Sequence, residues 1–214
     1  MCGGLCGDVQ DLSAFPDLLT GAVRMCCAGE MELITCRTFI RQRSIGDASA
    51  LSAYYLRNAE HLTRWEPARP AGYHRQLEWL RRIEADGADA VHLVARLQDA
   101  PQEIAAICSF TGIARGVFQA CHMGLSVDAA HQGSGLMAEV AEAGIQHMFQ
   151  AEGLHRIMAS HLPENQRSAA LLQRLGFCRE GYARKYLKIA GSWRDHVLTA
   201  RLAEDAGPER DQNR

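Results

Sequence analysis

Long apolar runs are missing from this 214-residue sequence. No stretch approaches the ~20 consecutive apolar residues that a membrane-spanning helix requires. The N-terminus also lacks a basic flank followed by an unbroken apolar stretch, which argues against a secretory signal. We therefore expect a soluble protein that makes no membrane contact and is located in the cytoplasm.

A strong excess of charge is missing as well. The 23 Lys and Arg residues nearly balance the 25 Asp and Glu residues, so the net charge is −2. This balance gives the whole chain no electrostatic basis for direct DNA binding or for attachment to an anionic membrane. Basic residues do cluster between Arg174 and Lys188. Such a cluster is typical of a solvated face, and contact with a polyanion such as the ribosome is the alternative.

Paired cysteine motifs are absent, although the chain has eight cysteines. Cys2, Cys6, Cys26 and Cys27 fall near the N-terminus but form no C-x-x-C pair, so their spacing predicts no metal site. Disulfides are not expected in a reducing cytoplasm. The other four are scattered singly among apolar residues and are predicted to be small buried side chains: Cys36, Cys108, Cys121 and Cys178.

The domain organisation follows from length and composition. A hydrophobic content of 47% over 214 residues is enough for one substantial core and does not require two. Residues 1–30 are rich in Gly and Cys and predict an N-terminal extension, which is either disordered or precedes the true start of translation at Met25 or Met31. We predict one folded domain over residues 31–203 and a charged tail over residues 204–214.

Hydrophobic periodicity predicts alternating helices and strands from Glu32 to Leu202. Asp47 is expected to be an N-cap, and Gly176 is expected to stop a short helix. The predicted strands cover residues 38–43, 91–97, 104–110, 118–127, 156–162, 181–189 and 193–202. One predicted helix begins near residue 47. Three further predicted helices cover residues 73–83, 136–150 and 168–174.

A glycine-rich turn is the most informative motif. It separates the apolar run at residues 122–127 from the amphipathic run that opens at Leu136. Such a turn leaves backbone N–H groups unpaired at a helix N-terminus, where the helix dipole favours an anion. The turn lacks the lysine of a P-loop and the third glycine of a dinucleotide fingerprint. The pattern indicates either an ordinary strand-to-helix turn or a phosphate cradle made from Gln132, Gly133, Ser134, Gly135, Leu136 and Met137.

The order of elements around this turn resembles the fold of the GNAT N-acetyltransferases. Gln132 and Gly135 match the family pattern Gln/Arg-x-x-Gly-x-Gly/Ala. The last position of the pattern is Met137 in this sequence. Further motifs resemble the RimJ/RimL branch, the ribosomal-protein N-terminal alanine acetyltransferases, and RimJ more than RimL. They are Trp65-Glu66-Pro67, His155-Arg156-Ile157-Met158-Ala159, Asn165-x-x-Ser168, Leu175-Gly176-Phe177, Glu180-Gly181-Tyr182 and Trp193-Arg194-Asp195-His196.

This resemblance implies an α/β (α+β) fold. Its central sheet is mixed and mostly antiparallel, with a splayed parallel pair and helices on both faces. It also implies that acetyl-CoA is the cosubstrate and that no metal is needed. The pyrophosphate would lie on the glycine turn, and the pantetheine arm would pair with Leu125, Ser126 and Val127. Asn165 would lie beside the coenzyme arm.

The proton-donating residue implied by the resemblance is Ser168, which would protonate the departing thiolate. The alternative for Asn165 and Ser168 is N-capping of the helix that follows. Other family members use a tyrosine acid at the position of Leu172, so that mechanism is excluded at this position.

The proton-accepting residue is harder to assign. Relatives carry a carboxylate at the position of Lys185, and a lysine accepts a proton at pH 7 only if burial strongly depresses its pKa. We therefore expect Glu66 to serve as the carboxylate, with a structural hydrogen bond to the backbone as the alternative role. A water molecule relayed through Ser160 or His161 is a further alternative.

The acceptor implied by the resemblance is the N-terminal α-amine of a ribosomal protein that begins with Ala or Ser. One alternative is a GNAT enzyme that acetylates a small-molecule amine. Another is a coenzyme-binding or ribosome-associated assembly factor with little catalysis. Trp193 to His196 are expected to pack in a terminal hairpin with a local ion pair, and substrate contact is the alternative.

Overall fold

The computed structural model describes residues 22–25, 31–67, 69, 72–86 and 89–206. The predictions for residues 1–21 and 26–30, and for most of the charged tail, lie outside the described residues. The same holds for Cys2, Cys6, Cys26 and Cys27. No helix in the part of the chain described is long and apolar enough to cross a membrane.

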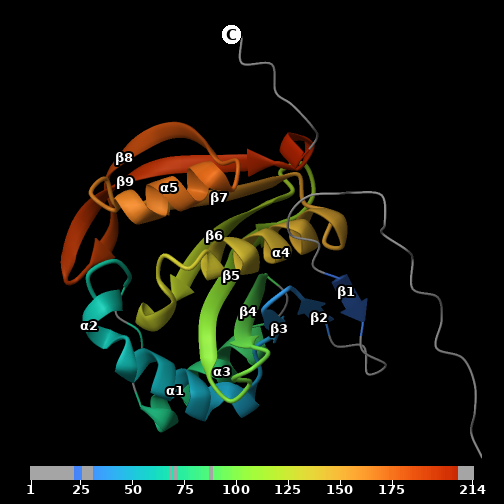
Figure 1. Cartoon of the computed structure of the whole chain (residues 1–214). Coiled ribbons are helices and arrows are strands. Elements are labelled where there is room, and N and C mark those ends of the chain that lie inside the picture. Colours follow the sequence, from blue (N-terminus) through green and yellow to red (C-terminus); the bar gives the residue numbers. More distant parts are fainter. Residues whose placement is uncertain (1–21, 26–30, 68, 70–71, 87–88, 207–214) are drawn as a thin grey trace, which may run out of the picture.

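A nine-stranded sheet runs through the molecule in the order β1-β2-β3-β4-β5-β6-β7-β9-β8 (Figure 1). Every neighbouring pair is antiparallel except β6 and β7, which are parallel. The predicted mixed and mostly antiparallel sheet is therefore confirmed. The strands are β1 (Ala22–Met25), β2 (Met31–Ile34), β3 (Thr38–Gln42), β4 (Ala90–Leu97), β5 (Ile104–Ala114), β6 (Ala120–Val127), β7 (Arg156–His161), β8 (Cys178–Ile189) and β9 (Ser192–Leu202).

Helices cover both faces of this sheet, as predicted (Figure 1). Alternation along β4 shows why, because Leu93 and Ala95 pack with α4 on one face while Val94 packs with α1 and α3 on the other. The helices are α1 (Ala48–Arg57), α2 (Ala59–Leu62), α3 (Tyr73–Asp86), α4 (Leu136–Gln150) and α5 (Gln166–Arg174), with 3-10 turns η1 (Ile45–Asp47), η2 (Ala129–His131) and η3 (Ala203–Ala206).

Helix α4 lies unusually close to the sheet at Gly144. A β-carbon at this position would lie 3.0 Å from the Phe110 ring on β5, which is tighter than most side chains tolerate. Glycine therefore permits the contact that fixes α4 against the central strands. Since the glycine turn leads directly into α4, this contact also helps to fix the position of that turn.

The parallel pair separates part of the way along its length. Pairing of β6 with β7 ends at Met123 and Ala159, although β6 continues to Val127 and β7 to His161. On its other edge, β6 stays paired with β5 as far as Val127. The edge of β6 that faces β7 therefore carries backbone groups with no strand partner among the described residues. The predicted splay is confirmed.

Two sequence predictions need correction in this structure. Asp47 stands at the N-cap position of α1, but its carboxylate makes no cap hydrogen bond there. It accepts instead from Arg41 at 2.6 Å and from Arg96 at 2.9 Å, because two guanidinium groups from neighbouring strands converge on it. Cys36 and Cys178 are exposed, whereas Cys108 and Cys121 are buried as predicted. Cys36 lies in a turn and Cys178 begins the edge strand β8, so neither faces the core.

Candidate active site

The glycine turn joins η2 to α4 and presents backbone donors in one place. Gly133 and Gly135 have φ values of +72° and +79°, which only glycine adopts without strain. Among the described residues, the Leu136 N–H reaches only the Ser134 hydroxyl, at 3.3 Å. Within the described chain, no acceptor is found for the N–H groups of Gly133, Gly135, Met137 and Ala138. Four free donors at a helix N-terminus form an anion cradle.

A basic side chain that the sequence did not predict borders this cradle. Arg37, in the turn between β2 and β3, donates from Nη1 to the Ser134 carbonyl at 3.0 Å. Its Nε donates to Glu139 Oε2 at 2.7 Å, and Glu139 is only 4% exposed. Arg37 therefore adds positive charge beside Gly135. No local motif marks it, because its partners lie about a hundred residues further along the chain.

Glu139 is the anchor of this arrangement. Burial by itself would raise the pKa of its carboxyl, but hydrogen bonds from Thr35 and from both the side chain and the backbone of Arg37 hold the pKa below its usual value. The carboxylate is therefore ionised at neutral pH and keeps Arg37 oriented toward the glycine turn.

A second arginine reaches the turn from α5. Arg167 donates to the side-chain oxygen of Gln132, and the Gln132 amide nitrogen lies 2.8 Å from His61 Nδ1 in α2. The first residue of the cradle thus links α2 and α5. Gln132 lies at the cradle as predicted, but nothing in the local sequence indicates either partner.

The open edge of β6 lies beside a small buried cluster of polar groups. The Ser126 hydroxyl lies 2.7 Å from the Tyr54 hydroxyl on α1. The Ser126 side chain also lies close enough to Glu66, which follows α2, to lower the pKa of its carboxyl. The Ser126 side chain is thus occupied on the α1 side of the sheet, so only its backbone remains to meet a ligand along the edge. Leu125 and Val127 turn their side chains to the opposite core.

Glu66 has the electrostatic character of a proton acceptor. Burial raises the pKa of its carboxyl, and the Arg69 charge and the Ser126 hydrogen bond offset this in part. The Arg69 guanidinium is 4.0 Å away. Among the described residues, no backbone N–H donates to this carboxylate. A raised pKa brings a carboxylate closer to neutral pH, where a general base works best.

The Asn-x-x-Ser motif lies at the start of α5. Asn165 is the N-cap of this helix, and its side-chain oxygen accepts from the Ser168 N–H at 3.1 Å. Asn165 thus has the N-capping role that was the alternative to coenzyme contact. The half-buried Ser168 hydroxyl has no hydrogen-bond partner within the described chain. Its assignment as proton donor remains a prediction.

The remaining candidate site residues lie in the terminal hairpin formed by β8 and β9. Lys185 is exposed and has φ +49°, and its N–H donates to Asp195 Oδ1 at 2.8 Å where β8 is irregular. Its exposure removes the burial that a proton-accepting role would require. Tyr182 donates to the other Asp195 oxygen at 2.8 Å. Arg194 forms an ion pair with Glu164, which lies between β7 and α5 and so outside the hairpin in which a local ion pair was expected.

A buried histidine lies on β9, close to the end of β7. His196 lies on β9, is 3% exposed and interacts electrostatically with His161 on β7. Burial lowers its pKa, so the imidazole is neutral at pH 7. The His161 Nδ1 lies 2.9 Å from the Leu162 carbonyl. The sequence predicts that His196 packs in a terminal hairpin, but its burial depends on how β9 meets β7.

Comparison with known proteins decides the family. Residues 37–178 match a family described as acetyltransferase (GNAT) domain. The chain belongs to the GNAT acetyltransferase family. This GNAT protein is 38% identical, over 187 residues, to [ribosomal protein uS5]-alanine N-acetyltransferase of Escherichia coli (strain K12). The match covers 85% of this chain and 95% of that protein.

Solved GNAT structures agree with this placement. The chain is similar to ribosomal-protein-S5-alanine acetyltransferase from Vibrio fischeri, with a TM-score of 0.73 and 35% identity over 80% of this chain and 96% of that one. It is also similar to Mycobacterium smegmatis RimJ in complex with CoA-disulfide, with a TM-score of 0.71 and 31% identity over 80% and 84% of the two chains. The resemblance to the RimJ/RimL branch is confirmed.

Family membership makes this GNAT protein an acetyl-CoA-dependent acyltransferase, as predicted. In the described part of the chain, no three His, Cys, Asp or Glu side chains are grouped to hold a metal ion. The residues present suit the coenzyme, because free N–H groups lie in the glycine turn, two arginines bond to residues of that turn, and β6, which precedes it, has an open edge.

Proposed function

We propose that this GNAT enzyme transfers the acetyl group of acetyl-CoA to the N-terminal α-amine of a ribosomal protein that begins with Ala or Ser. The observation that carries the proposal is the 38% identity to a uS5-alanine N-acetyltransferase over 95% of that protein's length. A ribosomal acceptor also implies a cytoplasmic location and contact with the ribosome. The basic cluster between Arg174 and Lys188 supplies a surface for that contact.

The pyrophosphate end of the coenzyme is assigned to the cradle. The backbone of Gln132, Gly133, Ser134, Gly135, Leu136 and Met137 supports this assignment through its free N–H groups and the α4 dipole. Arg37 and Arg167 add positive charge that would attract the pyrophosphate. Methionine at position 137 is compatible with the role, because the group needed is its backbone N–H.

The pantetheine arm is assigned to the open edge of β6 at Leu125, Ser126 and Val127. Among the described residues, the backbone groups on this edge have no strand partner, and an amide-bearing arm can satisfy them as an added strand would. Asn165 and Ser168 begin the helix that follows β7, so this arm would end close to them.

When bound, acetyl-CoA supplies the thioester carbonyl that the acceptor amine attacks. An α-amine has a pKa near ~8, so part of it is already neutral at pH 7. Glu66 would take the proton that the amine loses, and Tyr54 and Ser126 would hold this carboxylate in place. The Ser168 hydroxyl would give a proton to the departing sulfur.

The test uses labelled acetyl-CoA and a synthetic peptide that begins with Ala and contains an internal lysine. We expect label on the α-amine, located by fragment masses. The matched control is the same peptide with a chemically blocked N-terminus, which should take up no label. Transfer only to the lysine side chain, or only to small amines such as spermidine in a parallel panel, would overturn the proposal.

A further inference from the structure

The hairpin of β8 and β9 extends past the end of β7 (Figure 1). Pairing of β9 with β7 ends at Val197 and His161, whereas β8 and β9 stay paired as far as Ile189 and Ser192. Among the described residues, no third strand pairs with residues 182–196, which therefore form a two-stranded ribbon at the edge of the sheet. Such an edge is open to a partner, and its side chains decide which partner fits.

The ribbon concentrates positive charge. Its cations are Arg184, Lys185, Lys188 and Arg194. Asp195 is its one carboxylate, although the chain as a whole has a net charge of −2. Arg194 pairs with Glu164, but within the described part of the chain the other three cations form no ion pair. The ribbon therefore has positive charge left over for an anionic partner.

One face of the ribbon combines this charge with two exposed aromatic rings. Side chains two residues apart on a strand share a face, so Trp193, Asp195 and Val197 point the same way. Lys188 lies directly opposite Trp193, and Tyr182 lies directly opposite Val197, so both belong to this face as well. Trp193 is 60% exposed and Tyr182 is 50% exposed. Large exposed rings grouped on one face are typical of an interaction surface.

The carboxylate on this face is already engaged. Asp195 accepts from the Tyr182 hydroxyl and from the Lys185 N–H, at 2.8 Å in both cases. The charges of Arg184 and Lys185 also lie near it. These contacts use the Tyr182 hydroxyl and leave the face of its ring open, and they place two further cations beside the aromatic face.

The opposite face of the ribbon is used within the molecule. Arg194 and His196 alternate with Trp193 and Asp195 and so point to this other face. Arg194 is held there by Glu164, and the Tyr186 ring lies 5.6 Å from the ring of the buried His196. The aromatic face with Trp193 is therefore the one that remains for a partner.

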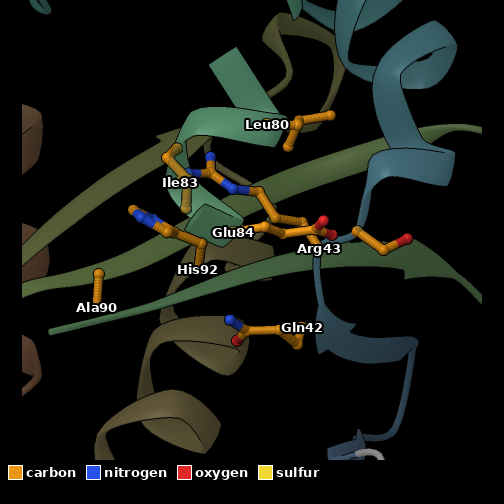
Figure 2. A pocket seen from close by; sticks show the side chains of 8 residues that line it. Gln42, Arg43, Leu80, Ile83, Glu84, Ala90 and His92 are labelled. Atoms are coloured by element: carbon orange, nitrogen blue, oxygen red, sulfur yellow. The ribbon is translucent and has the colours of Figure 1, made fainter. Parts of the chain in front are cut away.

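The cavity between α3 and strands β3 and β4, with a volume of about 240 Å³, offers no such excess of charge (Figure 2). Arg43, which follows β3, and Glu84 on α3 both line it, so one cation is matched by one carboxylate. Outside the glycine cradle, an anionic partner is therefore better matched by the ribbon than by this cavity.

We propose that the aromatic face of the ribbon binds single-stranded RNA. Bases stack on the rings of Trp193 and Tyr182, and phosphates meet the unpaired cations. Trp193 and Val197, the partner of Tyr182, are four residues apart on β9, or about 13 Å, so the two rings hold different bases. The proposal rests on the proposed function for the source of the strand, which is the ribosome, and on the ribbon alone for the chemistry.

The exposed rings favour this ligand over other anions. An acidic peptide would use the cations and leave the rings unused. A duplex keeps its bases stacked on one another, so it offers no free base to an aromatic ring. Unpaired bases with their phosphates use both features of the face.

The test uses fluorescein-labelled oligouridine of about 12 nucleotides as the probe and fluorescence anisotropy as the measurement. We expect saturable binding that weakens as salt is added. The same strand paired with oligoadenosine should bind less tightly, and polyglutamate should not displace the single strand. Equal or tighter binding of the duplex, displacement by polyglutamate, or binding of phosphatidylserine vesicles without binding of oligouridine would overturn the proposal.

Two variants test the two features separately. Trp193→Ala removes one stacking ring and should lower the affinity for oligouridine about tenfold. Lys188→Gln removes one phosphate contact, so the slope of log affinity against log salt should become shallower by about 0.7. Both side chains are exposed, so the thermal midpoint should stay at the wild-type value. Unchanged affinity in Trp193→Ala would contradict the proposal.

Matched controls remove the same groups elsewhere on the surface. Phe118→Ala deletes a 51% exposed ring between β5 and β6, and Arg81→Gln deletes an exposed cation on α3. Both should bind oligouridine as the wild type does. A loss in Phe118→Ala equal to that in Trp193→Ala would place the RNA elsewhere and overturn the proposal.

Acetylation of the Ala peptide, measured on the same wild-type preparation without RNA, separates this proposal from the proposed function. Acetylation of the peptide without binding of oligouridine would overturn the RNA proposal alone. Binding of oligouridine without acetylation of the peptide would overturn the proposed function, and with it the ribosome as the source of the strand, while supporting the RNA-binding face.

Discussion

The two ends of the proposed active site are built from different material. The phosphate end consists mainly of backbone N–H groups, positioned by two glycines and the start of α4. The amine end consists of side chains contributed by α1, β6, the segment after α2 and the start of α5. A backbone site is specified by a short stretch of sequence, whereas a side-chain site depends on how distant segments meet. Substitutions should therefore affect the two ends through different kinetic constants.

Glu66→Gln should have the largest effect. If this carboxylate accepts the amine proton, kcat should fall about 100-fold, while the affinity for acetyl-CoA stays unchanged. The pKa of Glu66 is raised, so the wild-type rate should decrease as the pH falls through that pKa and the carboxyl becomes protonated. Steady-state rates measured across pH should show this decrease at low pH for the wild type and not for Glu66→Gln.

The control for that experiment is Glu60→Gln, an exposed carboxylate on α2. It should keep the wild-type rate and the wild-type pH profile. A normal kcat in Glu66→Gln would contradict the proton-accepting role and assign Glu66 a structural role.

Gly135→Val should mainly damage the phosphate end. A non-glycine residue at φ +79° costs about 1–2 kcal/mol, which corresponds to a loss of about 5- to 30-fold in acetyl-CoA affinity if the cradle must relax. Calorimetric titration with acetyl-CoA measures this loss. The KM for the acceptor peptide should change little.

Gly153→Val is the matched control, because Gly153 has φ +67° and open space around the β-carbon position. It carries a similar strain far from the cradle. It should lower stability without changing acetyl-CoA affinity. Equal losses of affinity in the two variants would mean that strain alone explains the effect.

Ser168→Ala should lower kcat about tenfold if its hydroxyl protonates the leaving sulfur. The helix cap uses the Ser168 backbone N–H and the Asn165 side chain, so alanine at position 168 leaves the cap intact. Asn165→Ala removes the cap and should cost about 1 kcal/mol of stability. A Ser168→Ala enzyme with unchanged kcat, measured at saturating substrates, would assign this motif to structure alone.

Glu139→Gln should have the smallest effect on activity, weakening acetyl-CoA binding by less than Gly135→Val does. It should lower the free energy of unfolding at pH 7 by about 1–2 kcal/mol, since hydrogen bonds to a buried charge are lost. The depressed pKa of Glu139 means that this contribution is present above its unfolded pKa of about 4.3 and disappears as the pH falls through the folded pKa.

Urea unfolding of the wild type and of Glu139→Gln between pH 3 and pH 8 should therefore give curves that converge at low pH. Glu78→Gln, an exposed change on α3, should follow the wild type throughout. A gap between wild type and Glu139→Gln that stays constant down to pH 3 would show that the ionised carboxylate is not what stabilises the cradle.

Local signals account for the parts of this molecule that could be predicted. Gly176 was expected to end a helix, and it follows α5 with φ +77° and a bond from Phe177 N–H back to the Leu172 carbonyl. The terminal hairpin was also expected, and its strands β8 and β9 are joined by Ala190 and Gly191, which both have positive φ. Periodicity identified α4, because its apolar face meets a single core.

Contacts between distant segments account for what could not be predicted. Nothing near Arg37 indicates that Glu139 will hold it beside the glycine turn. Strands β1 and β2 were missed because four residues are too few to show alternation, and pairing at the edge of the sheet is what orders them. Glu66 was identified from a family motif, but its contact with Ser126 depends on how α2 and β6 meet.

The short parallel ladder between β6 and β7 also has a mechanical meaning. Only four residue pairs, from Ala120–Arg156 to Met123–Ala159, join a six-strand block to the block formed by β7, β9 and β8. The sheet therefore has a seam, and the seam opens where the coenzyme arm is assigned. A ligand that bonds along β6 there would connect the two blocks and restrict their relative movement. Stiffness of the whole molecule would then rise and fall with each turnover.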